Sequence, residues 1–596
     1  MATASTSKQA MQSPTTKSYD VAIVGAGIVG AALAYSLGRS GRRVVLLERD
    51  LSEPDRIVGE LLQPGGIRAL GLLDLLDCLH DIDAVPVQGY HVFYGERSVP
   101  IPYPEEKNFD DGIKGIDSGS GKVEGRSFHH GRFVQRLRKR AMEQPNVSTI
   151  EATVKELLEE DGGKVVGVAA SRKDANGEDE EVKIKASLTI VVDGCFSKFR
   201  RTHGSTIQPI VRSNFVALEL EHAPLPSPQH GHVVLGPSGP TLLYQISTVH
   251  TRILIDVGGE KLPSASKGHL QSHIRDNVLP HLPKPVQPCL LAELDKGQRL
   301  RSMPNSFLPP SMQGQNAHRS GVILVGDAMN MRHPLTGGGM SVGLWDVVYL
   351  TNELGGTSSW RPSQSCSTRN ERDLQDWASL KPALRSWHWL RKSRSSAINI
   401  LAQALYSLFG ASDENLEVLR QGCFAYFEQG GECVGGPVRL LSGLTPDPML
   451  LVYHFFSVAI LSIVLLFREG TEKARKEGRS MLLTYPRLMV RSVLVFWTAC
   501  VVLFPVVFSE LRSNVPTFKQ AANAAVDGAS APSKKGQSHT TLAFALFAAL
   551  AAAYLYSTST ALTAGAGSAA GLGPNSSSSA GFHFSPIKLL FSEAKV

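Results

Sequence analysis

The sequence predicts an α/β protein in which a Rossmann-type domain is interleaved with a β-sheet domain and followed by membrane-associated helices. Three observations predict this fold class. A glycine-rich loop follows an apolar strand near the N-terminus, a buried strand over 321–325 ends in a Gly-Asp-Ala turn, and two long apolar runs without formal charge lie near the C-terminus. A chain of 596 residues is also too long for one ordinary core, so several lobes are expected.

The N-terminal glycine loop follows the apolar strand 21–24 and carries Gly25, Gly27 and Gly30. In a βαβ unit the first two glycines allow a tight turn and a close approach to a pyrophosphate, and the third lets the helix pack on the strand. The helix N-terminus adds N–H groups and a positive dipole. Glu48 follows the second strand, where a carboxylate can hold an adenosine ribose. The loop therefore predicts a bound dinucleotide.

The composition of the chain argues against several classes of function. The net charge of +7 is modest and no basic stretch alternates with aromatic residues, which argues against a nucleic-acid groove. The seven cysteines are scattered without a C-x-x-C pair, so we expect reduced thiols facing the cytosol and neither a disulfide framework nor a metal site. The first 18 residues are polar, which predicts a disordered leader and no signal peptide.

The late segment 321–340 supplies a second group of candidate residues. Asp327 follows the buried strand, where its carboxylate can accept hydrogen bonds from ribityl hydroxyls, and Gly337–Gly339 expose N–H groups at a helix N-terminus. Such a terminus suits the negative charge of a reduced isoalloxazine. Only one G-x-G-x-x-G occurs, so we expect a permanently held flavin that receives its electrons from elsewhere. A strand-end turn followed by a flexible linker is the alternative.

Two runs, Met449–Phe467 and Ser492–Ser509, are free of formal charge and near the lower length limit for crossing a bilayer. The loop between them is rich in arginine and lysine, as expected beside an anionic cytoplasmic leaflet. A single crossing by the first run would place the dinucleotide domain in the lumen, so we expect a monotopic insertion with the catalytic lobes in the cytosol. Helices buried in a soluble core are the alternative.

Several segments carry a resemblance to known families. The glycine loop with the Asp193-Gly194 and Gly-Asp-Ala turns resembles flavin monooxygenases of the aromatic-hydroxylase type. More narrowly, the chain resembles the squalene monooxygenase (squalene epoxidase) family from about Tyr19 to Glu510, through the segments LLERDLSEPDRIVGELLQPGG, SFHHGRF, GDAMNMRHPLTGGGM, NILAQALYSLF, GGECVGGPV and HFFSVA. It departs from that family in lacking an N-terminal membrane segment, in insertions near 107–124 and 355–370, and in its tail.

The resemblance implies an oxidoreductase with non-covalent FAD, O₂ as co-substrate, and NADPH as an indirect electron source through an NADPH-dependent diflavin reductase. It implies epoxidation of squalene to (S)-2,3-epoxysqualene in sterol (ergosterol) biosynthesis, on the cytosolic side of the endoplasmic reticulum membrane and on lipid droplets. The motifs and the matching family positions together give these expected FAD contacts: Gly25, Gly27, Ile28, Val29, Gly30, Glu48, Arg49, Arg56, Arg138, Val154, Asp327, Gly338, Gly339 and Met340.

Gln63 and Tyr90 are the candidate active-site pair. Gln63 precedes a Pro-Gly-Gly turn and Tyr90 lies on the first strand of the second lobe, so a hydrogen bond between them could tie the lobes beside the flavin. A core tyrosine and a turn glutamine are the alternative. The expected lining of the squalene cavity, from matching family positions, is Phe409, Phe424, Phe427, Leu440 and His454. No ligand spacing accompanies His333 or His454, so neither predicts a metal site.

The expected organisation follows the chain in seven parts: a disordered leader (1–18), the first part of the FAD-binding domain (19–89), a mixed region of substrate-domain sheet and FAD-domain returns (90–320), the Gly-Asp-Ala segment (321–350), a helical cavity wall (371–447), membrane-associated helices (448–510), and a low-complexity tail with a further hydrophobic stretch at 540–556 (511–596). Two other functions stay open. One is a flavin monooxygenase hydroxylating another apolar or phenolic substrate, and the other is a non-catalytic membrane protein with a flavin fold.

Overall fold

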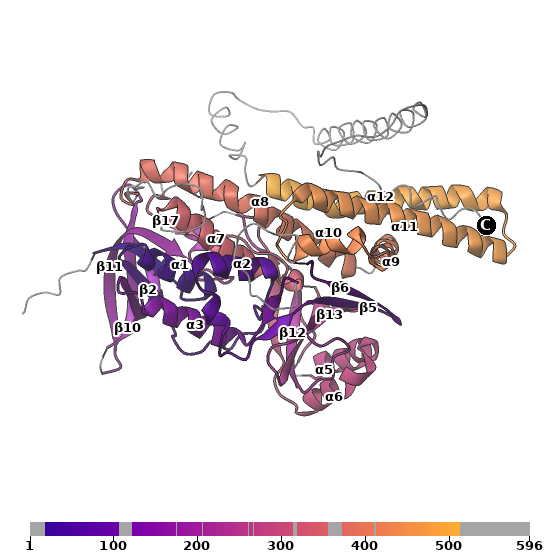
Figure 1. Ribbon diagram of the computed structural model, residues 1–596, viewed down its shortest axis with the longest axis horizontal. Coiled ribbons are helices and arrows are strands. Elements are labelled where there is room, and N and C mark those ends of the chain that lie inside the picture. Colours follow the sequence, from indigo (N-terminus) through magenta and orange to yellow (C-terminus); the bar gives the residue numbers. More distant parts are fainter. Residues whose placement is uncertain are drawn as a thin grey trace, which may run out of the picture. The chain divides into compact units, whose positions relative to one another are not determined.

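The computed structural model describes residues 18–105, 122–174, 176–204, 207–259, 261–265, 267–313, 319–355, 372–410 and 413–512. Two large β-sheets and a group of long C-terminal helices dominate this part of the chain (Figure 1). The leader, most of both insertions, and the tail with its hydrophobic stretch at 540–556 lie outside the described residues.

The first sheet has the order β8-β2-β1-β11-β10-β9, and β17 pairs with the end of β11. Its strands are β1 (Ser18–Val24), β2 (Val44–Glu48), β8 (Val147–Glu151), β9 (Thr153–Glu159), β10 (Val165–Lys173), β11 (Asp179–Val191) and β17 (Val322–Leu324). The strands β8, β2, β1, β11 and β17 run parallel, whereas β9 and β10 pair antiparallel. Because parallel strands end at the same edge, the loops after β1 and β17 open on one side.

Helices α1 (Ile28–Arg39), α3 (His130–Met142) and α7 (Gly339–Glu353) pack with this sheet into the first core. The close approach of α1 requires a glycine, since a Cβ on Gly30 would lie 1.9 Å from the carbonyl oxygen of Gly25. Helix α2 (Pro64–Leu73) packs on α7, and short strands β3 (Leu61–Leu62), β4 (Val85–Val87) and β7 (Gly125–Ser127) form a small third sheet.

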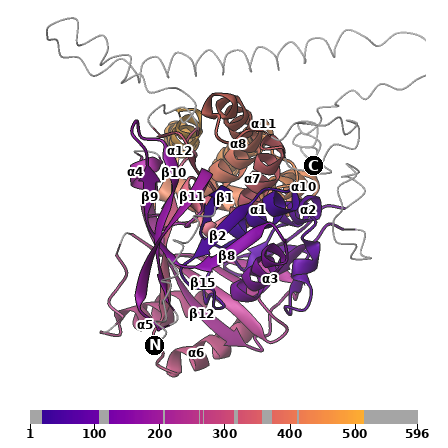
Figure 2. The ribbon, with the colours of Figure 1, turned by 90° about the vertical axis from the view of Figure 1, so that its left-hand side faces the viewer.

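The second sheet has the order β16-β12-β15-β14-β13-β5-β6. Its strands are β5 (Gly89–Tyr94), β6 (Arg97–Pro102), β12 (Ile210–Glu221), β13 (His230–Gly236), β14 (Gly239–Gln245), β15 (His250–Gly258) and β16 (Arg301–Phe307). Figure 2 shows it below the first sheet, with α5 (His269–His273) and α6 (Gln287–Asp295) at its far side. The strand containing Tyr90 therefore begins the second sheet, as the alternation of its residues predicts.

Alternate residues of the second sheet enter two different cores. Val216 and Leu218 of β12 belong to the core covered by α5 and α6, whereas Phe215 and Ala217 belong to the core shared with the C-terminal helices. A strand buried on both faces in this way needs apolar residues at nearly every position. The second sheet therefore has one face available for a substrate cavity beneath the helices.

The C-terminal helices are α8 (Trp377–Phe409), α9 (Glu414–Glu428), α10 (Glu432–Leu441), α11 (Pro448–Lys476) and α12 (Met481–Arg512). Helices α11 and α12 form a long antiparallel hairpin that contacts α8 and α9 (Figure 1). Both are long and apolar enough to cross a membrane, and 28% of each apolar window is buried. The hairpin extends well beyond the uncharged runs because the basic residues between the runs continue the helices.

Candidate functional site

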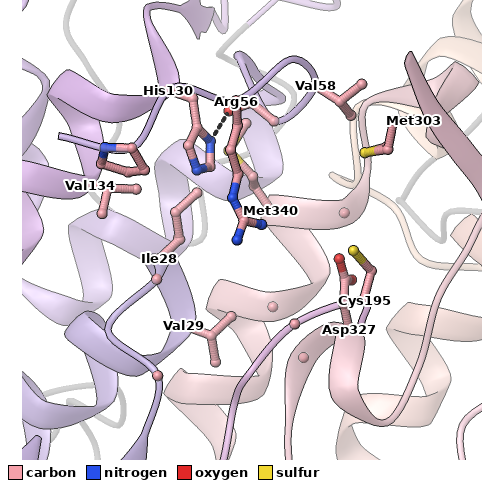
Figure 3. A pocket seen from close by; sticks show the side chains of 18 of the residues that line it. Ile28, Val29, Arg56, Val58, His130, Val134, Cys195, Met303, Asp327 and Met340 are labelled. Carbon is pink, nitrogen blue, oxygen red and sulfur yellow. Dashed lines mark hydrogen bonds between the residues drawn. The ribbon is translucent and has the colours of Figure 1, made fainter. Parts of the chain in front are cut away.

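A cavity of about 920 Å³ lies between the two sheets, where the loops after β1 and β17 meet the second sheet. Figure 3 shows Arg56 reaching into it, with Ile28 and Val29 on one side and Asp327 and Cys195 on the other. The other predicted cofactor contacts that line it are Gly25, Gly27, Glu48, Arg49, Arg138, Val154, Gly339 and Met340. Its size is within the range of ligand-binding clefts.

Gly30 and Gly338 do not line this cavity, and both are required by packing instead. A Cβ on Gly30 would strike the Gly25 carbonyl, and a Cβ on Gly338 would lie 2.5 Å from the Ile398 side chain. These two glycines therefore shape the helix starts without facing the cavity.

The glycine loop is held to the tip of β2. Gly25 has a φ of +108°, and a Cβ there would lie 2.7 Å from the Val192 carbonyl, so the turn tolerates only glycine. The backbone N–H of Ala26 donates to Glu48 Oε2 at 2.7 Å, and that of Arg49 donates to Glu48 Oε1 at 3.0 Å. Glu48 thus fixes the loop while its remaining lone pairs face the cavity.

Arg138 of α3 braces the same loop from the other side. Its Nε donates to the Ala26 carbonyl at 2.8 Å and one terminal nitrogen donates to the Ser52 carbonyl at 3.0 Å. Burial lowers the pKa of this guanidinium, while the nearby Glu48 carboxylate, 3.7 Å away, raises it. A buried positive charge beside a helix N-terminus suits a pyrophosphate.

Asp327 lies in the short helical turn η7 (Gly326–Ala328) that follows β17. Its side chain is exposed to the cavity, and Arg200 donates to its backbone carbonyl at 2.9 Å. The surrounding protein desolvates the carboxylate and raises its pKa, whereas Arg332, Arg200 and Arg56 lower it. The carboxylate is therefore an acceptor set in a cationic environment.

The cavity fits a dinucleotide. Gly27 and Gly339 open α1 and α7, both line the cavity, and a Cβ on either would meet no protein atom within 4 Å. Packing within the protein therefore does not explain these glycines, whereas a ligand close to the backbone does. Two helix N-termini and the guanidinium groups of Arg49, Arg56 and Arg138 suit a phosphate-bearing cofactor such as FAD.

The predicted hydrogen bond between Gln63 and Tyr90 is present, with Gln63 Nε2 as the donor. The same nitrogen donates to the Thr336 carbonyl at 2.8 Å, and Tyr103 donates to Gln63 Oε1 at 2.6 Å. Gln63 is fully buried, Tyr90 lines the cavity, and burial raises the pKa of both tyrosines. The cluster joins α2, the second sheet and the loop before Gly337.

Sequence reasoning missed Tyr103 and the sheet residues facing the cavity. Tyr103 follows β6 beside the insertion, so its contact with Gln63 depends on how the β5–β6 hairpin folds. The missed lining residues of the second sheet are Gly231, His232, Leu242, Tyr244, Leu254, Met303, Pro304 and Ser306. Leu242 and Tyr244 stand at alternate positions of β14, a signal that a strand pattern could have provided.

A second cavity, of about 60 Å³, lies among α8 to α11. The predicted residues Phe427, Leu440 and His454 line it together with apolar side chains such as Leu405 and Phe455. Phe409 and Phe424 do not line it. Both are buried in the adjacent core, where Phe424 packs against Tyr94 and under the Arg97 guanidinium.

Helix α12 ends in a buried polar cluster. Ser396 and Asn399 of α8 donate to the Glu510 carboxylate, both at 2.9 Å, and Glu510 is 2% exposed. Asn399 also donates to Asn330 Oδ1 at 3.3 Å, and Arg332 donates to the same oxygen at 2.9 Å. Hydrogen bonds therefore run from the hairpin to the loop that follows Asp327.

His333 is a structural residue of this loop. Its Nδ1 accepts from the Leu335 N–H at 3.2 Å, its Nε2 lies 3.1 Å from Ser213 Oγ, and Tyr406 stacks on its ring. Burial lowers its pKa, so the neutral ring with its hydrogen on Nε2 satisfies both contacts. The six cysteines in the described ranges form no disulfide.

Comparison with known proteins finds matches along most of the chain. A family model described as squalene epoxidase matches residues 185–476, and one described as FAD dependent oxidoreductase matches residues 20–54. A squalene epoxidase, erg1, of Aspergillus fumigatus is 46% identical over 82% of this chain and 93% of its own length. A squalene monooxygenase of Mus musculus is 43% identical over 83% of this chain and 78% of its own length.

Solved structures with the same fold include p-nitrophenol 4-monooxygenase PnpA from Pseudomonas putida. Its TM-score is 0.55 at 19% identity, and the match covers 73% of this chain and 98% of that protein. The flavin-dependent brominase Bmp2 gives a TM-score of 0.55 at 14% identity, covering 74% of this chain and 98% of that protein. At these identities the likeness concerns the fold alone.

Proposed function

The chain belongs to the squalene epoxidase family and catalyses the FAD-dependent epoxidation of squalene in sterol biosynthesis, and we propose that its residues act by binding, orientation and exclusion of water. Residues that line the larger cavity, among them Glu48, Arg138 and Asp327, would hold FAD, which would supply the activation of O₂ with electrons that come indirectly from NADPH. An electron-rich alkene needs no general base, so the protein has no proton to remove from the substrate.

One observation carries this proposal. The cofactor-sized cavity is polar at the glycine loop and apolar where Tyr90, Leu242 and Leu254 of the second sheet face it. The apolar end lies under the face of the sheet that shares its core with α8, α9 and α11. A terminal double bond held there would be beside the N-terminus of α7 and away from bulk water.

The first prediction concerns how electrons reach the flavin. NADPH alone should reduce the bound flavin slowly, because the chain has a single glycine fingerprint and no second dinucleotide domain. Addition of a diflavin reductase should accelerate reduction, and O₂ with squalene should then yield the 2,3-epoxide, identified by mass spectrometry. Fast stoichiometric reduction by NADPH without the reductase would contradict the proposal. Reduction without any epoxide would contradict the assigned substrate.

Tyr90→Phe should lower epoxidation or raise release of hydrogen peroxide while the fold and the flavin are retained. The change removes one of the three groups bonded to the Gln63 amide, at a cost of about 1 to 3 kcal/mol. A barrier increase of about 1.4 kcal/mol is a tenfold loss of rate. Tyr94→Phe is the matched control, because Tyr94 lies on the same strand and donates to Glu417 instead. If the parent, Tyr90→Phe and Tyr94→Phe give equal yields of epoxide and of peroxide, Tyr90 is a core residue without a role in the reaction.

The α11–α12 hairpin is the proposed membrane-binding element. Its exposed large apolar residues are Met449, Tyr453, Ile460, Val464, Leu482, Leu483, Tyr485, Met489, Val490, Val493, Leu494, Trp497, Val501 and Phe508. The basic residues lie toward the tip of the hairpin, from Arg468 to Arg491. A perpendicular insertion would carry that tip into the lumen, against the preference of basic segments for the cytosol.

A hairpin lying within one leaflet satisfies both constraints. The apolar side chains enter the acyl region, the arginines and lysines remain among the head groups, and the catalytic sheets stay in the cytosol. Squalene dissolved in the bilayer would then reach the cavity between α8, α10 and α11 directly. We further propose the endoplasmic reticulum membrane as the location, and lipid droplets as a second one, because the family resemblance implies them.

A further inference from the structure

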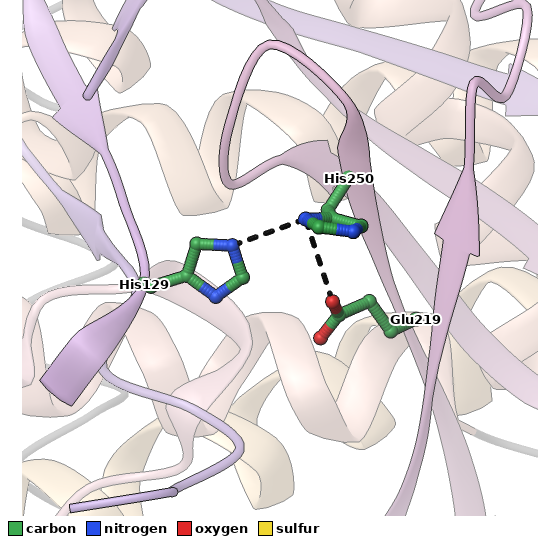
Figure 4. A group of neighbouring side chains, drawn as sticks. All are labelled: His129, Glu219 and His250. Atoms are coloured by element: carbon green, nitrogen blue, oxygen red, sulfur yellow. Dashed lines mark hydrogen bonds and ion pairs between the residues drawn. The ribbon is translucent and has the colours of Figure 1, made fainter. Parts of the chain in front are cut away.

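Two histidines and a glutamate from three distant segments converge where β12 ends and β15 begins in the second sheet (Figure 4). His129 precedes α3, Glu219 lies near the end of β12, and His250 begins β15. Each offers one ligand atom, and these three atoms lie within 4.8 Å of one another. The group is the only set of three such residues at this spacing in the described part of the chain.

The distances match the edges of a metal coordination polyhedron. His129 Nε2 lies 3.3 Å from His250 Nδ1, which lies 3.6 Å from Glu219 Oε1. Nitrogen and oxygen ligands at about 2.0 to 2.2 Å from a tetrahedral Zn²⁺ are separated by about 3.3 to 3.6 Å. Two of the three atom pairs are thus at ligand-to-ligand distance, and the third pair lies within 4.8 Å and closes by a small movement.

His250 Nδ1 has three polar neighbours, which are Ser247 Oγ, His129 Nε2 and Glu219 Oε1. Ser247 Oγ accepts from the backbone N–H groups of Val249 and His250, at 3.2 and 2.8 Å, and lies 3.1 Å from His250 Nδ1. Metal binding to Nδ1 uses the single lone pair of that nitrogen, so the Ser247 hydroxyl hydrogen must point elsewhere when the metal is bound. Glu219 Oε1, another acceptor, faces the same nitrogen, and a cation between the two would satisfy both.

The surrounding charges tolerate a cation. Arg252 donates to Glu219 Oε2 at 3.1 Å, which orients the carboxylate and leaves Oε1 toward the histidines. Arg252 is also paired with the buried Glu60 at 2.8 Å, and Arg132 lies 4.0 Å from Asp83. Each nearby arginine thus has a carboxylate partner of its own.

We propose that His129, Glu219 and His250 form a binding site for a divalent transition metal, with Zn²⁺ the best match to a two-histidine, one-carboxylate set. Water completes the coordination. The metal ties the start of α3, in the FAD-binding half, to β12 and β15 of the second sheet. Its role is to brace the two halves outside the cofactor cavity, since none of the three ligands lines that cavity.

The test uses the full-length, FAD-loaded protein without a histidine tag, stripped by a chelator and titrated with Zn²⁺ against a chromophoric competitor. One equivalent should bind, and Co²⁺ should give absorption bands typical of tetrahedral coordination. His129→Ala and His250→Ala should weaken binding by about tenfold or more, since even the loss of an outer-shell partner costs that much. Zn²⁺ should raise the melting temperature of the parent and not of these variants.

His203→Ala is the matched control, because His203 pairs with Glu159 at 2.8 Å and belongs to no such three-residue group. It should bind Zn²⁺ as the parent does. If an alanine variant fails to fold, Glu219→Gln keeps the size of the side chain and should still weaken binding. Absence of stoichiometric binding to the parent, or equal binding by the parent and all three ligand variants, would overturn the proposal.

Discussion

Deletion of every residue after Pro446 should abolish squalene epoxidation while FAD stays bound. The deletion removes Leu451, His454, Phe455 and Val458, which form one wall of the apolar cavity, and it removes the hairpin that would reach the bilayer. All residues lining the larger cavity lie between Val24 and Gly343, so its lining is untouched. The flavin content of the purified protein checks that FAD stays bound, and epoxide formation in detergent checks that activity is lost. Normal turnover by the truncated protein would disprove the cavity wall.

A pair of point changes distinguishes a loss of activity caused by blocking the small cavity from a loss caused by general instability. A Cβ on Gly436 would lie 1.9 Å from His454 Nε2, whereas a Cβ on the adjacent Gly435 would come no closer than 3.4 Å to any atom outside its local helix backbone. Both glycines lie within α10, where alanine favours the helix by up to about 1 kcal/mol. Gly436→Ala should therefore impair epoxidation and Gly435→Ala should not. The expected pattern fails if both variants behave alike.

Asp327→Ala should release the flavin. The change removes a charged acceptor from the cavity, at the proposed position of the ribityl hydroxyls, and hydrogen bonds to charged groups contribute about 1.5 to 3 kcal/mol. The dissociation constant should rise by about tenfold to more than a hundredfold, measured by flavin fluorescence during titration of the stripped protein. Asp327→Asn, which keeps one acceptor oxygen, should lose less. If the alanine variant binds flavin with unchanged affinity, Asp327 is not part of the cofactor site.

Local signals in the sequence predicted most of the cofactor half. Gly25, Gly27 and Glu48 act within one βαβ unit, so their spacing is nearly sufficient to place them. Asp327 was predicted by the same means, since the end of a buried strand and the following turn are contiguous. The Gln63–Tyr90 hydrogen bond was expected from the positions of the two residues in the chain, and it is present. The roles of these residues in catalysis stay predictions.

Contacts between distant segments escaped prediction. The His129, Glu219 and His250 side chains meet only because β12 and β15 pair in register while α3 packs nearby, and no spacing along the chain encodes this meeting. Phe424 and Phe427 show the limit for helices. They lie one turn apart on α9, yet Phe427 faces the small cavity and Phe424 is fixed in the core beneath Arg97. Helical spacing predicts which residues share a side of the helix, but it does not predict what each of them contacts.

The lengths of α11 and α12 were underestimated for a different reason. The two runs were delimited by their hydrophobicity, so each was taken to end at the first charged side chain. Helix formation does not stop there, since lysine, arginine and glutamate are good helix formers. The charges therefore mark where the helices would leave the acyl region and not where they end.

The hydrogen bonds from Glu510 through Asn399 to Asn330 connect the end of the α11–α12 hairpin to the loop that follows Asp327. Arg332 bonds to the same Asn330 oxygen and carries a charge felt by Asp327. If lipid around α12 alters the affinity for FAD, loading of FAD must alter the affinity for lipid by the same factor, because coupling free energies are reciprocal. Under that condition the membrane would be an effector of the cofactor site as well as the solvent of the substrate, and an enzyme depleted of flavin would bind the bilayer with a different affinity.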